Sequence, residues 1–175
     1  MAKKSARKRN SETAVTSSSA PKGGIPESIT ILVHGTFSRA IGFWYRPRSK
    51  MARYLRANVF EDVYGRSDYF RWTATADDAA REQGKDDLLK WCEEHPASKY
   101  NFVAHSHGCS VVSFASNEGL NNIGKLVLLA PPVWRDRPEY HPNLSNVDDG
   151  KVFNFHARQD LIVTQVARPP AVQNY

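Results

Sequence analysis

One serine in this sequence has the surroundings that nucleophilic catalysis requires. Residues 101–110 read Asn-Phe-Val-Ala-His-Ser-His-Gly-Cys-Ser, so Ser106 lies between an apolar run typical of a buried strand and a predicted helix. Small residues, Ala104 and Gly108, stand two positions before and after it. A serine on a sharp strand-to-helix turn projects from its sheet, and small neighbours let the adjoining backbone pass closely. The pattern therefore predicts Ser106 as the nucleophile of an acyl transfer.

These residues resemble the nucleophile turn of the α/β-hydrolase family, written G-x-S-x-G, with Ala104 in place of the first glycine. A second segment, Val33-His34-Gly35-Thr36-Phe37, resembles the HG-x loop of the same family. The resemblance implies that the backbone N–H groups of Thr36 and His107 form an oxyanion hole. The loss of one such donor typically costs about 3 kcal/mol of transition-state stabilisation. It also implies that His34 is structural and anchors the loop.

A carboxylate follows the last predicted strand. Asp160 stands 54 residues after Ser106, which matches the family's chain order of serine, acid and histidine. By this resemblance, Asp160 orients the catalytic imidazole and stabilises its charged form. Asp136, in the loop after the preceding strand, is the reserve candidate. The resemblance covers residues 28–165 and implies a lipase-like or esterase-like serine hydrolase.

The general base of the family is a histidine beyond the acid, and no histidine follows Asp160. Without a base, a serine hydroxyl is a poor nucleophile near neutral pH. Two explanations compete. The chain is a gene fragment or truncated product that stops before that histidine, or it is a non-catalytic binding protein that kept the fold. A relocated base, His141 or His156, ranks third. The other histidine expectations are that His105 and His107 support the turn, that His156 is buried and structural, and that His95 faces solvent.

The elements that must position these residues alternate along the chain. Such alternation predicts βαβ units, hence an α/β fold with a mostly parallel sheet and helices on both faces. The expected buried stripe of the long central helix is Ala76, Ala79, Ala80, Leu88, Leu89 and Cys92. The strands are expected at 28–33, 69–75, 99–104, 125–130 and 151–155, and the helices at 49–60, 77–95 and 107–116.

Charge divides the chain unequally. The formal net charge is +6, and residues 1–22 hold six basic residues against one acidic residue, a net +5. We predict a disordered basic tail and linker over 1–26, and an α/β-hydrolase domain, incomplete at its C-terminus, over 27–175. The tail favours at most a weak nucleic-acid or anionic-surface contact. No basic stripe with interleaved aromatic residues is apparent in the rest of the chain.

The remaining expectations concern compartment and ligands. The basic start of the chain is not followed by the apolar region of a secretory signal, so we expect a cytoplasmic protein. No apolar run is long enough to span a membrane. Cys92 and Cys109 are expected to be free thiols, and no metal site or cofactor is predicted. The expected substrate is a small-molecule or lipid ester. Its acyl pocket could include Trp134, Tyr140, Phe37, Phe43, Trp44 and Tyr45, which could equally be ordinary core or surface aromatics.

Overall fold

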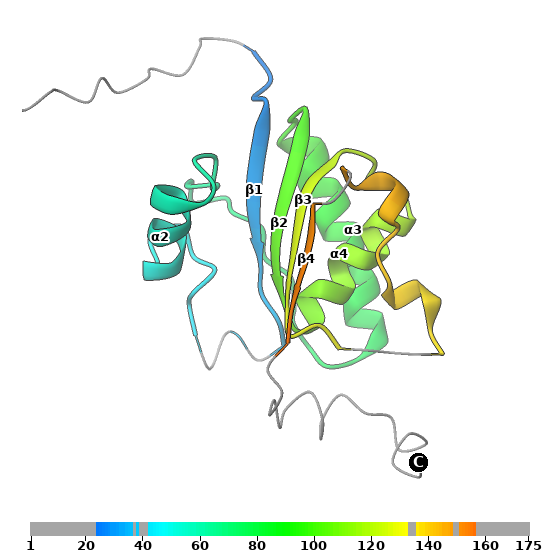
Figure 1. The fold of residues 1–175 in the computed structure, drawn as a ribbon. Coiled ribbons are helices and arrows are strands. Elements are labelled where there is room, and N and C mark those ends of the chain that lie inside the picture. Colours follow the sequence, from blue (N-terminus) through cyan, green and yellow to red (C-terminus); the bar gives the residue numbers. More distant parts are fainter. Residues whose placement is uncertain (1–23, 37, 39–41, 133–135, 149–150, 157–175) are drawn as a thin grey trace, which may run out of the picture.

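A four-stranded parallel sheet forms the centre of the protein. The computed structural model describes residues 24–36, 38, 42–132, 136–148 and 151–156 (Figure 1). The strands lie in chain order, each hydrogen-bonded to the next, and the register joins Val33 to Ala104 and Ala104 to Leu128. The strands are β1 (Ser28–Val33), β2 (Lys99–His105), β3 (Ile123–Leu129) and β4 (Val152–Phe155).

Helices cover both faces of this sheet (Figure 1). On one face lie α3 (Asp78–Glu94) and α4 (His107–Asn117), and on the other lies α2 (Lys50–Asn58). Two short 3-10 turns, η1 (Pro138–Tyr140) and η2 (Leu144–Asn146), precede β4. The predicted α/β fold with a parallel sheet is therefore confirmed.

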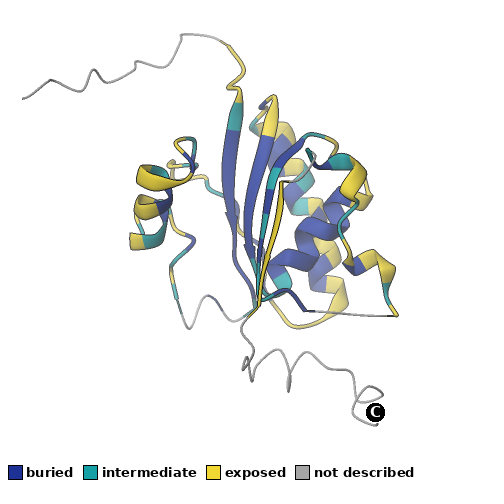
Figure 2. Ribbon diagram, viewed as in Figure 1, coloured by how far each residue is buried: buried dark blue, intermediate teal, exposed yellow. Residues whose placement is uncertain are grey.

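Two apolar clusters hold these layers together (Figure 2). The larger cluster lies on the α3 and α4 side and includes Phe102, Val111 and Leu126, all fully buried. The smaller cluster joins α2 to the other face, where Ala52 and Leu55 pack with residues that include Leu32, Val103 and Val63. Burial of apolar area on both faces explains why β1 and β2 are almost continuously apolar.

The two helices between β1 and β2 begin at side-chain caps. Ser49 accepts a hydrogen bond from the N–H of Ala52 at 2.9 Å, and Asp77 accepts one from the N–H of Ala80 at 2.8 Å. Such caps satisfy donors that the first helical turn leaves unpaired. The expected buried stripe of α3 is wrong in part, because Ala76 and Ala79 are exposed and Leu89 is only partly buried.

Gly84 explains how α3 approaches α4. A Cβ at this position would lie 3.0 Å from the Trp72 ring and 3.0 Å from a methyl group of Val111. The glycine that weakens the helix in isolation therefore permits close packing in the fold.

The strand expected at 69–75 is wrong. Phe70, Trp72 and Ala74 are buried and alternate with exposed residues, as predicted, but the segment joins no strand ladder. Instead, an isolated parallel bridge joins Val63 to Thr30 on the outer side of β1. Alternation reports that one side of a segment is buried, and it does not report whether a neighbouring strand is available for pairing.

Candidate functional site

Ser106 is the single residue between β2 and α4. Its backbone has φ 53° and ψ −131°, and it is one of three described non-glycine residues with positive φ. Such a conformation costs on the order of 1–3 kcal/mol and persists only where the surroundings hold it. Here the Ser106 N–H donates to the Leu129 carbonyl at 2.9 Å, and the Ser106 carbonyl accepts from the Cys109 N–H at 2.8 Å. The hydroxyl does not cap α4, and the residue is partly exposed.

Two glycines allow the segment after β1 to touch this turn. A Cβ on Gly108 would lie 2.5 Å from the His34 carbonyl oxygen, and a Cβ on Gly35 would lie 2.7 Å from the Ser106 Cβ. Both distances are too short for any real side chain, so only glycine fits. Because β1 and β2 are parallel and in register, the 34–36 segment lies on the same edge of the sheet as Ser106.

A side-chain hydrogen bond also joins the two segments. Thr36 Oγ1 and His107 Nδ1 lie 2.5 Å apart, although 71 positions separate them in the chain. Burial, and then the nearby Arg81 guanidinium, lower the pKa of His107 to about 4. The ring is therefore neutral near pH 7, and this contact is a hydrogen bond to an uncharged imidazole.

His34 anchors the loop through its buried ring. Its ring is buried and stacks on Trp72 at 5.9 Å, and Tyr45 packs against it at 4.2 Å. The Trp72 indole N–H donates to the His34 carbonyl at 2.8 Å, and the Ser38 hydroxyl donates to the Gly35 carbonyl at 2.6 Å. The loop is thus held by hydrogen bonds on both sides of Gly35.

Comparison with known proteins assigns no relative. No protein-family model matches the chain, and no match is found among curated proteins.

Within the described ranges, no helix has both the length and the apolarity of a membrane span. In the same ranges, no group of three or more His, Cys, Asp or Glu side chains is arranged to hold a metal ion. Cys92 and Cys109 are buried free thiols, as expected, and burial raises the pKa of each to about 12.

The two predicted carboxylates are placed differently. Asp160 lies outside the described residues. Asp136 is exposed and precedes Arg137, which forms an ion pair with Asp78 at the start of α3. Asp136 is therefore in a loop that is tied to α3.

The histidines differ in how far their side chains contact the rest of the fold. His95 does not simply face solvent, because its ring stacks on Trp91 at 4.1 Å and its Nε2 lies 3.1 Å from Asp68. His105 packs edge-on against Trp44 at 6.1 Å.

His156 is exposed, so the prediction of a buried structural histidine is wrong. It follows Phe155, which pairs with Leu129, and Leu129 pairs with His105. His156 is therefore level with Ser106, two strands or about 10 Å away along the edge.

An ionic cluster beside His107 was missed by the sequence analysis. Arg81 is 4% exposed and contacts Asp78 and the Tyr140 hydroxyl, while Arg137 binds Asp78 at 2.9 Å. These contacts, with a hydrogen bond from the Tyr140 hydroxyl, hold the pKa of Asp78 well below its usual range despite partial burial. The cluster fixes η1 against the first turn of α3. Its residues lie far apart in the chain, so only the acidic start of α3 was visible as a signal.

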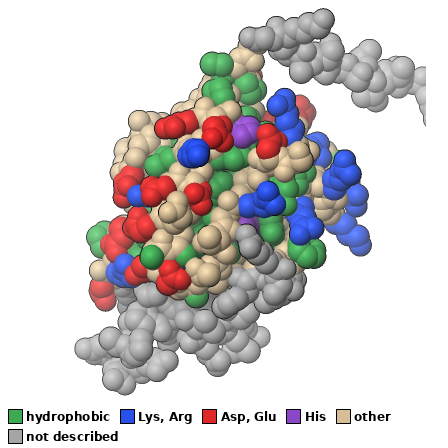
Figure 3. Space-filling model, turned by 180° about the vertical axis from the view of Figure 1, so that it is seen from behind, with side chains coloured by type: hydrophobic (Ala, Val, Ile, Leu, Met, Phe, Trp, Pro, Cys, Tyr) green, Lys and Arg blue, Asp and Glu red, His purple; other side chains and the backbone are tan. Residues whose placement is uncertain are grey.

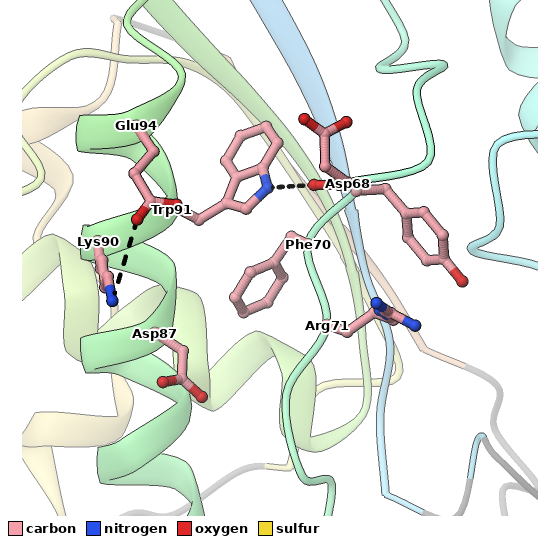
Figure 4. A pocket seen from close by; sticks show the side chains of 8 residues that line it. Asp68, Phe70, Arg71, Asp87, Lys90, Trp91 and Glu94 are labelled. Carbon is pink, nitrogen blue, oxygen red and sulfur yellow. Dashed lines mark hydrogen bonds and ion pairs between the residues drawn. The ribbon is translucent and has the colours of Figure 1, made fainter.

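A pocket of about 260 Å³ lies elsewhere, between α3 and the segment before Trp72 (Figure 4). The Trp91 indole N–H donates to the Asp68 carbonyl at 2.7 Å, and Lys90 pairs with Glu94. The pocket is shallow and mixes charges of both signs, and no residue of the Ser106 turn contributes to it. Its lining consists of Asp68, Tyr69, Phe70, Arg71, Asp87, Lys90, Trp91 and Glu94.

Proposed function

We propose that this protein is a serine hydrolase of the α/β-hydrolase type that acts on carboxylic esters. The observation that carries the proposal is the Ser106 turn. A partly exposed serine with positive φ forms the whole turn from a parallel strand into a helix. Such a turn presents a hydroxyl at the edge of the sheet, away from the helix it precedes. The contact with Gly35 brings a second loop to that hydroxyl, as an oxyanion hole requires.

In the proposed reaction, Ser106 Oγ attacks the carbonyl carbon of the ester and its proton passes to a base. The tetrahedral intermediate collapses by breaking the bond to the alcohol oxygen, which leaves with that proton and gives an acyl-serine. Water then cleaves the acyl-serine and releases the acid. The proposed oxyanion donors are the backbone N–H groups of Thr36 and His107, each contributing about 3 kcal/mol to the transition state.

The remaining parts of the proposal are the acid and the base. Asp160 is the proposed acid, and it follows β4, whose carboxyl end lies on the same edge as Ser106. A base must come within hydrogen-bond reach of the hydroxyl. His34, His95, His105 and His107 are occupied by the contacts described above. His156, which is level with Ser106, and His141, the other relocated base considered from the sequence, are the histidines to test as the base.

The first experiment is labelling by a fluorophosphonate, which reacts with activated serines. We expect the wild-type chain to be labelled and Ser106→Ala to be unlabelled, with unchanged circular dichroism. Ser98→Ala is the matched control, because Ser98 is an exposed serine away from the turn, and it should label as the wild type does. Labelling that survives Ser106→Ala unchanged would refute the nucleophile.

The second experiment measures hydrolysis of a short-chain nitrophenyl ester by His156→Ala and His141→Ala. Loss of a true base lowers the rate by about a thousandfold or more, because the hydroxyl is no longer activated. The variant that shows this loss identifies the base. A folded wild-type chain that neither labels nor hydrolyses the ester would support the non-catalytic binding protein instead.

A further inference from the structure

The charged residues of the folded region separate to opposite sides. Residues 42–60, which contain α2, carry five basic residues and no acidic residue. Residues 77–94, which contain α3, carry seven acidic residues against three basic ones. In Figure 3, Lys and Arg side chains gather on the α2 side at the right, and Asp and Glu side chains gather on the α3 side. The near-neutral total of residues 23–175 conceals this separation.

The outer surface of α2 and the segment before it form what we call the basic face, defined as Phe43, Arg46, Arg48, Lys50, Arg53 and Tyr54. Spacings of three and four residues place Lys50, Arg53 and Tyr54 on one side of the helix, opposite the buried Ala52 and Leu55. All six residues are exposed. No ion pair within the described ranges includes a residue of this face.

Aromatic side chains stand among these charges, so the expectation that no basic stripe with interleaved aromatic residues lies beyond the tail is wrong. Tyr54 is 62% exposed and Phe43 is 50% exposed. The Arg46 guanidinium lies over the Phe43 ring, 3.6 Å from its centroid. Cationic groups beside exposed aromatic rings suit the headgroup region of a bilayer, where basic side chains meet lipid phosphates and aromatic rings lie at the interface. A base could stack only on the free side of the Phe43 ring, and binding of a polynucleotide is therefore an outcome that the test below distinguishes.

We propose that the basic face is a docking surface for a bilayer that contains anionic phospholipid. This proposal stands apart from the hydrolase activity, because it depends on surface charge and not on Ser106. The same segment does border the candidate site, since Trp44 packs against the ring of His105. Docking would therefore hold the Ser106 edge of the sheet beside the membrane surface.

The test is co-sedimentation of the full chain with vesicles of phosphatidylcholine alone and of phosphatidylcholine with phosphatidylserine. We expect binding only to the anionic vesicles, with affinity that falls as salt is added. The variant Arg53→Glu removes one favourable charge and adds an unfavourable one. At about 1 kcal/mol per charge near the surface, it should weaken binding by more than about tenfold.

Lys90→Glu is the matched control, because it changes the net charge equally on the α3 side. It should bind within about twofold of the wild type if position and not total charge decides. Both variants keep the basic residues of 1–22, so any contribution from those residues is constant. Tyr54→Ser should weaken the binding that remains at high salt.

Three results would overturn the proposal. One is equal binding of the wild type to neutral and anionic vesicles, or to neither. Another is an equal loss in Arg53→Glu and Lys90→Glu, which would show that net charge alone matters. The third is binding of an oligonucleotide that Arg53→Glu abolishes while vesicle binding is unchanged, which would make the basic face a polynucleotide surface.

Discussion

The two halves of the sheet differ in how closely they are packed. In the β1–β2 half, Val33, Phe102 and Ala104 have no exposed surface, and backbone from one segment touches backbone of the other at Gly35 and Gly108. In the β3–β4 half, every residue of β4 is exposed, including Phe153 at 44% and Phe155 at 57%. The candidate nucleophile therefore lies over the half in which position is fixed by contact. A strained serine can be held only where its neighbours cannot move away.

The largest expected difference between the halves comes from removing one aromatic ring from each. Phe102→Ala should lower the free energy of unfolding by about 3–5 kcal/mol, because it opens a cavity in the core. Phe155→Ala should change it by less than about 0.5 kcal/mol, because the ring is mostly in solvent already. Urea denaturation of the two variants measures both values. Similar losses would mean that Phe155 is covered in solution.

The next effect concerns the close backbone approach. Gly108→Ala should cost about 3 kcal/mol or more, because its new methyl group collides with two carbonyl oxygens that cannot move independently of β1. The matched variant is Gly119→Ala, where φ is +126° but no atom would lie within 4 Å of the added carbon. Its cost is conformational strain of about 1 kcal/mol. A Gly108 variant that is no less stable than the Gly119 variant would contradict the close packing of the turn.

The smallest effect is a pH dependence from His107. Its folded-state pKa, lowered to about 4 by burial and by Arg81, is below the ordinary value of 6.5, so the unfolded chain binds the proton more tightly. The corresponding stability is complete above about pH 6.5 and is lost as the pH falls towards 4. We expect a loss of about 2 kcal/mol over that range, less than the full shift because the ring is partly exposed.

Denaturation of the wild type and of His107→Gln at a series of pH values tests this expectation. Glutamine keeps a hydrogen-bonding side chain and does not titrate, so the variant should lose less stability than the wild type between pH 6.5 and 4. The loss that remains in the variant comes from carboxylates with lowered pKa values, such as Asp78. The same slope in both proteins would assign the titration to another group.

Much of the fold could be predicted from the sequence, because it depends on local patterns. Apolar runs predicted the four strands to within two residues, and the helices expected at 49–60 and 77–95 are present as α2 and α3. The segment 69–75 failed because strand pairing requires a partner that alternation cannot reveal. The inward stripe of α3 failed in part because Gly84, Arg81 and Trp91 decide how that helix lies.

The candidate site shows the same division. The resemblance implied that Ser106 and the His34–Thr36 loop lie together, and the parallel pairing of β1 and β2 places both at one edge of the sheet. The Thr36–His107 hydrogen bond and the contacts of Arg137 and Tyr140 with Asp78 could not be predicted, because their partners are 71, 59 and 62 residues apart and meet only through side-chain packing. The role of Asp160 stays a prediction.

The sequence by itself determined four strands and three helices, and which residue stands at the turn between β2 and α4, because these follow from neighbours in the chain. Only the tertiary structure decided that Gly35 and Gly108 are contact points, that His156 is exposed and level with Ser106, and that basic and acidic side chains face opposite ways. The net charge of a sequence does not say on which side of the molecule each charged side chain lies. Contacts between distant segments form only when the helices and the sheet pack together. Local elements and long-range contacts both depend on burial and charge, but long-range contacts also depend on where the fold brings distant residues together.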